Sequence, residues 1–244
     1  MIKIFSFAAS CAGKKSHTAA FSDILAQAFM KKAALEKETV EYECLTGADL
    51  RIDYCRSCIS CFMKGSCPLD RQDDCAKLKK KMLEADILFF GTPVYLWQMS
   101  GIAKSVLDRI SYWTHRYELM GKPCLVFSST DSSHGPEVSK ELSMLMRFTG
   151  AIVIDAGTMT CEEIQIDPYE TASKLMEVFK DPASGVTYLQ QNAFLSRVIL
   201  IRRYFKNIKE TGQIAEEARI FRERGLDQYV LMKEAIEDKK NKVI

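Results

Sequence analysis

Residues 87–93 read Ile-Leu-Phe-Phe-Gly-Thr-Pro, which is four apolar residues in a row followed by a glycine and a proline. A short apolar run without alternating polar residues is typical of a strand buried on both faces of a parallel sheet. Gly91 and Pro93 are expected to end this strand and to bar its continuation. Similar apolar runs stand at residues 1–8, 40–45, 124–127 and 151–154.

Stretches with helical spacing of apolar residues lie between or after these runs, at residues 17–37, 102–110, 138–145 and 168–180. Five apolar runs that alternate with helical stretches require crossover connections, so they predict a parallel sheet covered by helices on both faces. The fold class is therefore α/β, a doubly wound five-stranded sheet in the flavodoxin-like order. Ligands of such sheets bind beyond the carboxyl ends of the strands, which directs attention to the loops after the first, third and fourth strands.

The pattern changes after Asp181-Pro182-Ala183-Ser184-Gly185. A stripe of apolar residues with helical spacing follows, made of Phe194, Val198, Ile201, Phe205 and Ile208. Residues 213–240 resemble one further charged helix. This predicts two parts, a flavodoxin-like domain over 1–182 with a cysteine-rich loop at 55–67, and a C-terminal helical extension over 183–244. The extension is too short for an ordinary core of its own, so we expect it to pack on the α/β domain or on another subunit.

Composition excludes several classes of protein. The chain has 244 residues, 47% of them hydrophobic, and its formal net charge is +2, which is too small to hold nucleic acid or an acidic membrane unaided. No apolar run reaches the length of a membrane span. The first seven residues lack the basic start and long apolar stretch of a signal peptide, so we expect a cytoplasmic protein.

The segment after the first run reads Ser10-Cys11-Ala12-Gly13-Lys14-Lys15-Ser16-His17-Thr18 and leads directly into a predicted helix. Its hydroxyl groups surround a glycine, and main-chain amides at a helix start point toward a bound anion. It lacks the glycine patterns of triphosphate loops and of dinucleotide folds. It therefore predicts a site for a phosphate monoester, with Lys15 among the candidate ligands. The alternative is that Ser16 only caps the helix.

The segment after the third run is Gly91-Thr92-Pro93-Val94-Tyr95-Leu96-Trp97. Its aromatic side chains offer planes on which a flat heteroaromatic ring can stack. Opposite a phosphate site on the same sheet edge, it predicts a phosphorylated flavin, FMN. The segment after the fourth run, 128–135, adds small donors to this edge. His134 there either protonates a reduced flavin or an oxygen substrate, or is an exposed loop histidine.

Four of the nine cysteines lie within thirteen positions as Cys-x2-Cys-x2-Cys-x5-Cys-Pro, namely Cys55, Cys58, Cys61 and Cys67. This compact spacing is typical of [4Fe–4S] binding. Zinc is the main metal alternative, but structural zinc sites usually combine two separated cysteine pairs. Four reduced free thiols are the other alternative. The remaining cysteines are expected to be small buried hydrophobic residues, namely Cys11, Cys44, Cys75, Cys124 and Cys161.

Taken together, the motifs of residues 1–180 resemble the NADPH-dependent FMN reductase superfamily, and within it the iron–sulfur flavoproteins. The resemblance is carried by the four cysteines and by Asp73-Asp74, Ala85-Asp86-Ile87, Gly91-Thr92-Pro93-Val94-Tyr95 and Leu107-Asp108-Arg109. It implies a flavodoxin-like fold, bound FMN and assembly as a homodimer or homotetramer. It also implies a [4Fe–4S] cluster near the flavin of a partner subunit.

By position, the resemblance assigns the FMN phosphate to Ser10, Ser16, His17 and Thr18. It assigns the isoalloxazine ring to Pro93, Val94, Tyr95 and Leu96. Thr92 and Trp97 of the same segment are further candidate cofactor-binding residues. Closure of the site falls to Ser128, Ser129 and Gly135, and iron ligation to Cys55, Cys58, Cys61 and Cys67. The chain departs from the usual pattern in its longer phosphate loop, in His17 and Trp97, and in its helical tail.

The predicted function is a flavin-dependent oxidoreductase that moves electrons between a donor and an acceptor through FMN. NAD(P)H or ferredoxin would be the donor, and a quinone or an oxygen species the acceptor. One alternative is a cluster-free NAD(P)H:FMN or quinone reductase. A second is a non-catalytic redox carrier or thiol-based sensor. Nothing in the chain resembles a Ser-His-Asp triad or a pair of catalytic carboxylates, so hydrolysis is not expected.

Overall fold

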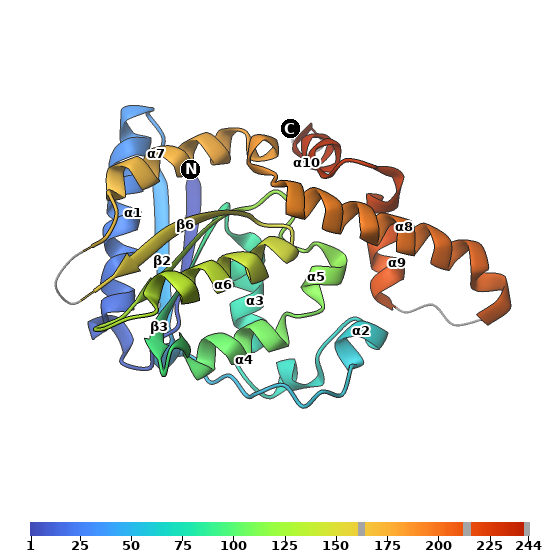
Figure 1. Ribbon diagram of the computed structural model, residues 1–244, viewed down its shortest axis with the longest axis horizontal. Helices are drawn as coiled ribbons and strands as arrows, with labels where there is room; N and C mark the ends of the chain where they lie inside the picture. The colour runs from blue at the N-terminus through green and yellow to red at the C-terminus, as the bar shows by residue number, and fades with distance from the viewer. Residues whose placement is uncertain (161–163, 212–215, 242–244) are drawn as a thin grey trace.

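A computed structural model describes residues 1–160, 164–211 and 216–241, with a parallel sheet between two layers of helices (Figure 1). The strands are β1 Ile2–Ala8, β2 Val40–Thr46, β3 Ile87–Tyr95, β4 Gln98–Met99, β5 Pro123–Ser129 and β6 Ile152–Met159. The helices of the sheet domain are α1 His17–Leu35, α2 Ser60–Lys64, α3 Cys75–Glu84, α4 Gly101–Arg109, α5 Trp113–Arg116, α6 Gly135–Phe148 and α7 Pro168–Lys180. The C-terminal helices are α8 Tyr188–Thr211, α9 Glu216–Glu223 and α10 Met232–Asn241.

The sheet confirms the predicted topology. Its strands run parallel in the order β2-β1-β3-β5-β6, and the two-residue β4 pairs antiparallel with the end of β3. Without β4, this is the flavodoxin order 2-1-3-4-5. The order reverses between β1 and β3, so their carboxyl ends flank the crevice in which ligands of such folds bind.

Alternate residues of β3 explain why its sequence is continuously apolar. Ile87 and Phe89 face the cluster formed with α1 and α7, whereas Leu88 and Phe90 face the cluster formed with α3, α4 and α6. All four side chains are fully buried. A central strand covered on both faces has no polar side, as the sequence predicted.

The expectation that Gly91 and Pro93 end this strand is wrong, because β3 continues to Tyr95 and Pro93 pairs with Ser129 of β5. The carbonyl of Gly91 accepts a hydrogen bond from Ala9, on the β1 side. Two residues further on, Pro93 presents its nitrogen to the same side, where β1 has already ended. Its missing N–H therefore costs no ladder hydrogen bond.

The C-terminal helices bury the predicted stripe against the sheet domain. Phe194, Val198 and Ile201 of α8 join a cluster with Tyr117, Met120 and Ile152 of the sheet domain. Phe205 is partly buried there, and the side chain of Ile208 lies outside the described residues.

The expectation of one helix over 213–240 is wrong. Two helices, α9 and α10, are separated by a 3₁₀ turn over Leu226–Gln228. Gly225 precedes the turn with φ +68°, in the left-handed region that stops a helix. Residues 213–215 of the predicted helix lie outside the described part.

The scattered cysteines only partly follow expectation. Cys44, Cys75 and Cys124 are buried, as predicted, but Cys11 is exposed in the loop after β1. Cys161 lies outside the described residues. Of the helices in the described part, none combines the length and the apolar character needed to cross a membrane.

Candidate functional site

A cavity of about 250 Å³ lies at the carboxyl edge of the sheet, where β1, β3 and β5 end. It brings together nine of the predicted site residues from three separate loops. These are Ser10, Lys15, Ser16, His17, Thr18, Pro93, Val94, Tyr95 and Ser129. Ala12, Thr130 and Asp131 also line the cavity and were not predicted.

The loop after β1 prepares the start of α1 to receive an anion. Ser16 is the N-cap of α1, and its hydroxyl accepts a hydrogen bond from Ala19 at 3.2 Å and donates one to the carbonyl of Gly13. Ser16 therefore does cap the helix, and its place in the phosphate site stays a prediction. The amides of His17 and Thr18 have no hydrogen-bond acceptor within the described part of the chain. Two free amides at a helix start, together with the helix dipole, favour a bound phosphate.

Two contacts join the loop after β1 to the loop after β5. The hydroxyl groups of Thr18 and Ser129, both buried, lie 2.7 Å apart. His17 Nδ1 lies 3.4 Å from Asp131 Oδ1 at the exposed mouth of the cavity. The first contact holds a hydroxyl donor close to the free amides of α1. The second places a carboxylate at the rim, where it limits the negative charge that the cavity accepts.

The turn between β3 and β4 is strained. Leu96 and Trp97 have φ of 48° and 62°, a geometry that hairpin turns usually fill with Gly or Asn. Leu96 is 98% exposed, and Trp97 stacks on His134 with 4.6 Å between ring centroids. His134 also has a positive φ, 63°. Strain of this kind needs support from surrounding contacts, and the stacked pair supplies one.

Five predicted site residues lie outside the lining of the cavity. Leu96 and Trp97 are exposed on the turn between β3 and β4. Thr92, Ser128 and Gly135 are buried next to the residues that line the cavity. The Thr92 hydroxyl accepts from the amide of Ser100 at 3.0 Å, and the Ser128 hydroxyl donates to the carbonyl of Gly135 at 2.8 Å. Thr92, Ser128 and Gly135 thus support the loops and do not face the cavity.

Hydrogen bonds from main-chain amides join the two ends of the cysteine-rich loop. The amide of Arg51 donates to Asp74 at 2.8 Å and the amide of Asp53 donates to Asp73 at 2.9 Å. The amide of Asp74 in turn donates to the carbonyl of Arg51. These bonds join the start and the end of the loop, so residues 54–72 form one closed excursion beside α4 and α5 (Figure 1).

The four cysteine thiols differ in their surroundings. Burial raises the pKa of Cys61, and the nearby thiols of Cys67 and Cys55 raise it further. Cys58 is exposed, and hydrogen bonds with Ser60 lower its pKa. Cys61 therefore lies within electrostatic reach of Cys67 and Cys55, while Cys58 interacts with Ser60 at the start of α2.

No three of these four thiols lie close enough together to bind a single metal ion. Among the described residues, the one group of metal-ligating side chains that does lie this close together contains none of the four cysteines. This arrangement does not fit a preformed zinc site. A cubane differs, because each of its cysteine ligands binds a different iron atom and the sulfurs lie farther apart. Four cysteines on one compact loop, without a tight group of three, are thus compatible with the wider sulfur spacing of a cubane and not with a preformed zinc site.

A buried arginine anchors this loop. Arg109 of α4 has no exposed side-chain surface and donates to Asp70 at 2.6 Å, to both oxygens of Asp73 and to the carbonyl of Asp53 at 3.0 Å. Burial alone would lower the pKa of Arg109, but the hydrogen bonds to Asp73 and Asp70 outweigh it and raise the pKa. Lys79 adds a second cation, 2.9 Å from Asp70.

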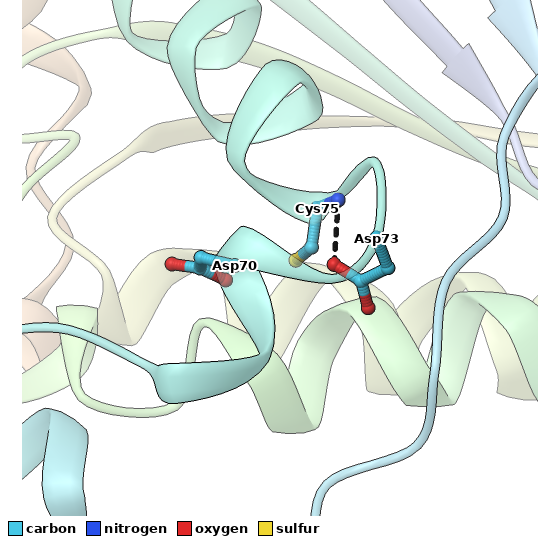
Figure 2. Close-up of side chains that lie close together, drawn as sticks. All are labelled: Asp70, Asp73 and Cys75. Atoms are coloured by element: carbon cyan, nitrogen blue, oxygen red, sulfur yellow. Dashed lines mark hydrogen bonds between the residues drawn. The ribbon is translucent and has the colours of Figure 1, made fainter.

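The group that does gather tightly is Asp70, Asp73 and Cys75, at the start of α3 (Figure 2). Its carboxylates already neutralise Arg109 and Lys79. Burial raises the pKa of Cys75 to about 11, so its thiol stays protonated near neutral pH, whereas a metal needs a thiolate. This cluster is an ion-pair network, and it does not fit a metal site.

Sequence reasoning missed this network and the Asp131 carboxylate. Asp73 and Arg109 were noted only as parts of a family resemblance. They lie 36 residues apart, and no local pattern marks their contact. Asp131 lies in the segment 128–135, where small donors are expected. Its negative charge is the signal that could have identified it as part of the rim of the cavity.

The comparisons with known proteins decide the family. The family model for NADPH-dependent FMN reductases matches residues 2–165. The chain belongs to the NADPH-dependent FMN reductase family. Membership confirms the expected resemblance to this family.

Two curated relatives are iron–sulfur flavoproteins by name. One, from Archaeoglobus fulgidus, is 33% identical over 88 residues, which is 36% of this chain and 39% of the relative. The other, from Methanocaldococcus jannaschii, is 37% identical over 76 residues, which is 31% of this chain and 38% of the relative. The chain thus spans about two fifths of the length of the curated relatives it matches.

Solved structures agree in fold. An oxidoreductase from Corynebacterium diphtheriae superposes with a TM-score of 0.52 at 15% identity, covering 76% of this chain and 97% of the other. An NADH:FMN oxidoreductase in its apo form gives 0.50 at 17% identity, covering 74% and 87%. These likenesses establish the fold that places the cavity at the carboxyl edge of the sheet.

Proposed function

We propose that this protein is an FMN-dependent oxidoreductase that binds the FMN phosphate at the start of α1. The observation that carries the proposal is the pair of free amides of His17 and Thr18 in a cavity at the edge where β1, β3 and β5 end. Lys15 lines the same cavity and adds a positive charge. Family membership supports a flavin in this place.

The residues of the chain divide the work of holding FMN. The amides of His17 and Thr18, the Thr18 hydroxyl and Lys15 would bind the phosphate. Ser16 gives its hydroxyl proton to the carbonyl of Gly13, whereas the Thr18 proton is free when Ser129 donates to Thr18. Pro93, Val94 and Tyr95 line the part of the cavity next to the isoalloxazine ring. When bound, FMN accepts two electrons as hydride and releases them singly or in pairs, which the side chains alone cannot do.

Removal of the Thr18 hydroxyl tests the phosphate site. Thr18→Val keeps the shape of the side chain, and we expect it to weaken FMN binding by about 1–3 kcal/mol, roughly 5- to 150-fold. Titration of the apoprotein with FMN, followed by flavin fluorescence, measures the effect. Ser22→Ala, one turn along α1 and bonded to Ser6 and Tyr42 instead, is the control and should bind FMN normally. Equal affinity of Thr18→Val and wild type would place the phosphate elsewhere.

The cysteine-rich loop would hold a [4Fe–4S] cluster through Cys55, Cys58, Cys61 and Cys67. The supporting observations are the proximity of the Cys61 thiol to those of Cys67 and Cys55 and the closed base of the loop. The names of the curated relatives point the same way. A cluster exchanges one electron at a time, and the chain would supply the four thiolates that hold it.

Iron content tests the cluster. Protein purified without oxygen is expected to contain about four iron and four sulfide atoms per chain. Cys61→Ala removes a half-buried thiol of the loop and should lose more than half of the iron, whereas Cys11→Ala, an exposed cysteine outside the loop, should retain it. Less than about one iron per wild-type chain would leave the cluster without support.

The exposure of Cys58 favours a second candidate function, a cluster-free NAD(P)H:FMN or quinone reductase. Steady-state oxidation of NADH and NADPH with quinones or oxygen as acceptors measures this activity, and reduced ferredoxin is the alternative donor. Tight FMN binding without turnover of any pair would indicate a redox carrier. Assembly as a homodimer or homotetramer stays a prediction, and sedimentation measures it.

A further inference from the structure

A second cavity, of about 590 Å³, lies at the edge of the sheet opposite the FMN site. Asp86 of its wall directly precedes β3 and Pro123 begins β5, whereas the FMN site lies at the carboxyl ends of these two strands. The rest of the wall comes from the end of α3, from residues 120–122, from the end of α7 with Pro182, and from α10; Figure 1 shows α7 and α10 at this end of the molecule. The cavity therefore lies between the sheet domain and the C-terminal helices, and ligand pockets often occur at such junctions.

The walls of this cavity are largely apolar. Met120 and Ile236 present buried side chains, and Phe179, Pro123 and Pro182 complete the surface. A hydrocarbon group that binds against such a lining gains roughly 25 cal/mol of free energy per Å² of apolar surface removed from water. The cavity can therefore take the apolar body of a ligand.

Three lysines border the same cavity, namely Lys122, Lys239 and Lys240. Their ammonium groups donate to main-chain carbonyls: Lys122 to Leu83 at 3.1 Å and to Ala85, Lys239 to Met120 at 3.1 Å, and Lys240 to Lys180 at 2.7 Å. An ammonium group has three N–H donors, so each lysine retains at least one.

These cations lack a neutralising carboxylate. Burial and the charge of Lys239 lower the pKa of Lys122 to about 8 despite the opposing effect of Asp86. Lys239 is exposed as a whole residue, but partial burial of its ammonium group and the charge of Arg224 lower its pKa, against an opposing effect of Glu118. Asp86 accepts the amide of Lys3 instead, and Glu84 pairs with Lys80. Within the described residues no ion pair reaches Lys122, Lys239 or Lys240, so a bound anion would relieve their mutual repulsion.

We propose that this cavity binds an apolar carboxylic acid, with its carboxylate between Lys122 and Lys239 and its hydrocarbon body against Met120, Phe179 and Ile236. The site is separate from the FMN cavity and does not depend on the proposed flavin chemistry. The alternative is that the lysines only bind the carbonyls at the ends of α3 and α7.

Calorimetric titration of the full-length, FMN-saturated protein tests this site. Octanoate and 4-phenylbutyrate are the probes, and octan-1-ol is the uncharged comparison. We expect both acids to bind at millimolar concentration or below, and octan-1-ol to bind at least about fivefold more weakly, because a charge-assisted hydrogen bond is lost. Saturation with FMN ensures that binding in the flavin cavity is not measured.

Lys239→Gln is the main variant, because Lys239 is exposed and its loss should leave the fold intact. Lys239→Gln should weaken the binding of both acids at least about fivefold, and Lys122→Gln should weaken it by a similar factor. Lys174→Gln, on the exposed side of α7 and paired with Glu170, is the control and should bind like wild type. Absence of heat at 10 mM of both acids, equal binding of octan-1-ol, or unchanged binding by Lys239→Gln would each overturn the proposal.

Discussion

Arg109→Ala is expected to lower the free energy of unfolding by about 3–5 kcal/mol, because it leaves buried carboxylates without their cation. Arg109 has no exposed side-chain surface, and Asp73, which it pairs with, has none either. Burial would raise the pKa of Asp73, but the hydrogen bonds from Arg109 and from the amides of Asp53 and Cys75 hold it below its usual range. Without the arginine, the Asp73 carboxylate is buried with no cation beside it, and only the two amides still stabilise its negative charge.

The same substitution should loosen the cysteine-rich loop. Arg109 donates to the carbonyl of Asp53 at the start of the loop and to Asp70 near its end. Urea denaturation followed by circular dichroism measures the stability, and iron content after anaerobic purification measures the integrity of the loop. We expect both to fall in Arg109→Ala. FMN affinity should change less, since neither Arg109 nor its partners line the FMN cavity.

Two further variants separate charge from geometry. Lys104→Ala removes an exposed cation from the same helix α4, where it pairs with Asp108, and should change stability by less than about 1 kcal/mol. Arg109→Lys keeps the charge but loses the forked geometry, so its stability should lie between those of wild type and Arg109→Ala. If Arg109→Ala were no less stable than Lys104→Ala, the network would not be what closes this loop.

Phe194→Ala should destabilise the protein by about 3–5 kcal/mol, because it removes a fully buried ring from the junction between α8 and the sheet domain. The ring of Phe194 lies 5.4 Å from that of Tyr117 in the sheet domain and 6.2 Å from that of Phe221 in α9. The cavity left behind would weaken contacts on both sides of the junction. Thermal and urea unfolding measure the loss.

Leu200→Ala is the matched control for this helix, since Leu200 lies on α8 with 56% of its surface exposed. Its replacement should change stability by less than about 0.5 kcal/mol. Similar losses for Leu200→Ala and Phe194→Ala would show that α8 does not pack on the sheet domain through Phe194. A large loss for Phe194→Ala alone would support one cooperative unit of sheet domain and C-terminal helices.

The sheet and the position of its ligand edge could be predicted from local sequence. The apolar run at 87–90 is continuous because β3 is covered on both faces, and the other strands follow the same rule. In a parallel sheet every loop that follows a strand lies at the same edge. Order along the chain therefore sufficed to bring Ser10, Thr18, Tyr95 and Ser129 to one cavity.

Strand and helix ends were less predictable. Pro93 is tolerated inside β3 because β1 has already ended beside it, which depends on the relative lengths of two strands. Gly225 divides the last charged stretch into α9 and α10 although charge and helical spacing continue across it. In both cases a neighbouring element or a single backbone dihedral angle outweighed the local propensity.

The sequence by itself determined the α/β class, the strand order and the loops that meet at the ligand edge, because these follow from hydrophobic period and chain order. Only the tertiary structure decided that Arg109 closes the cysteine-rich loop, that Trp97 stacks on His134, and that Lys122 and Lys239 share one cavity. These contacts join residues far apart in the chain. They depend on how the elements pack in three dimensions, and no local pattern of residues encodes that packing.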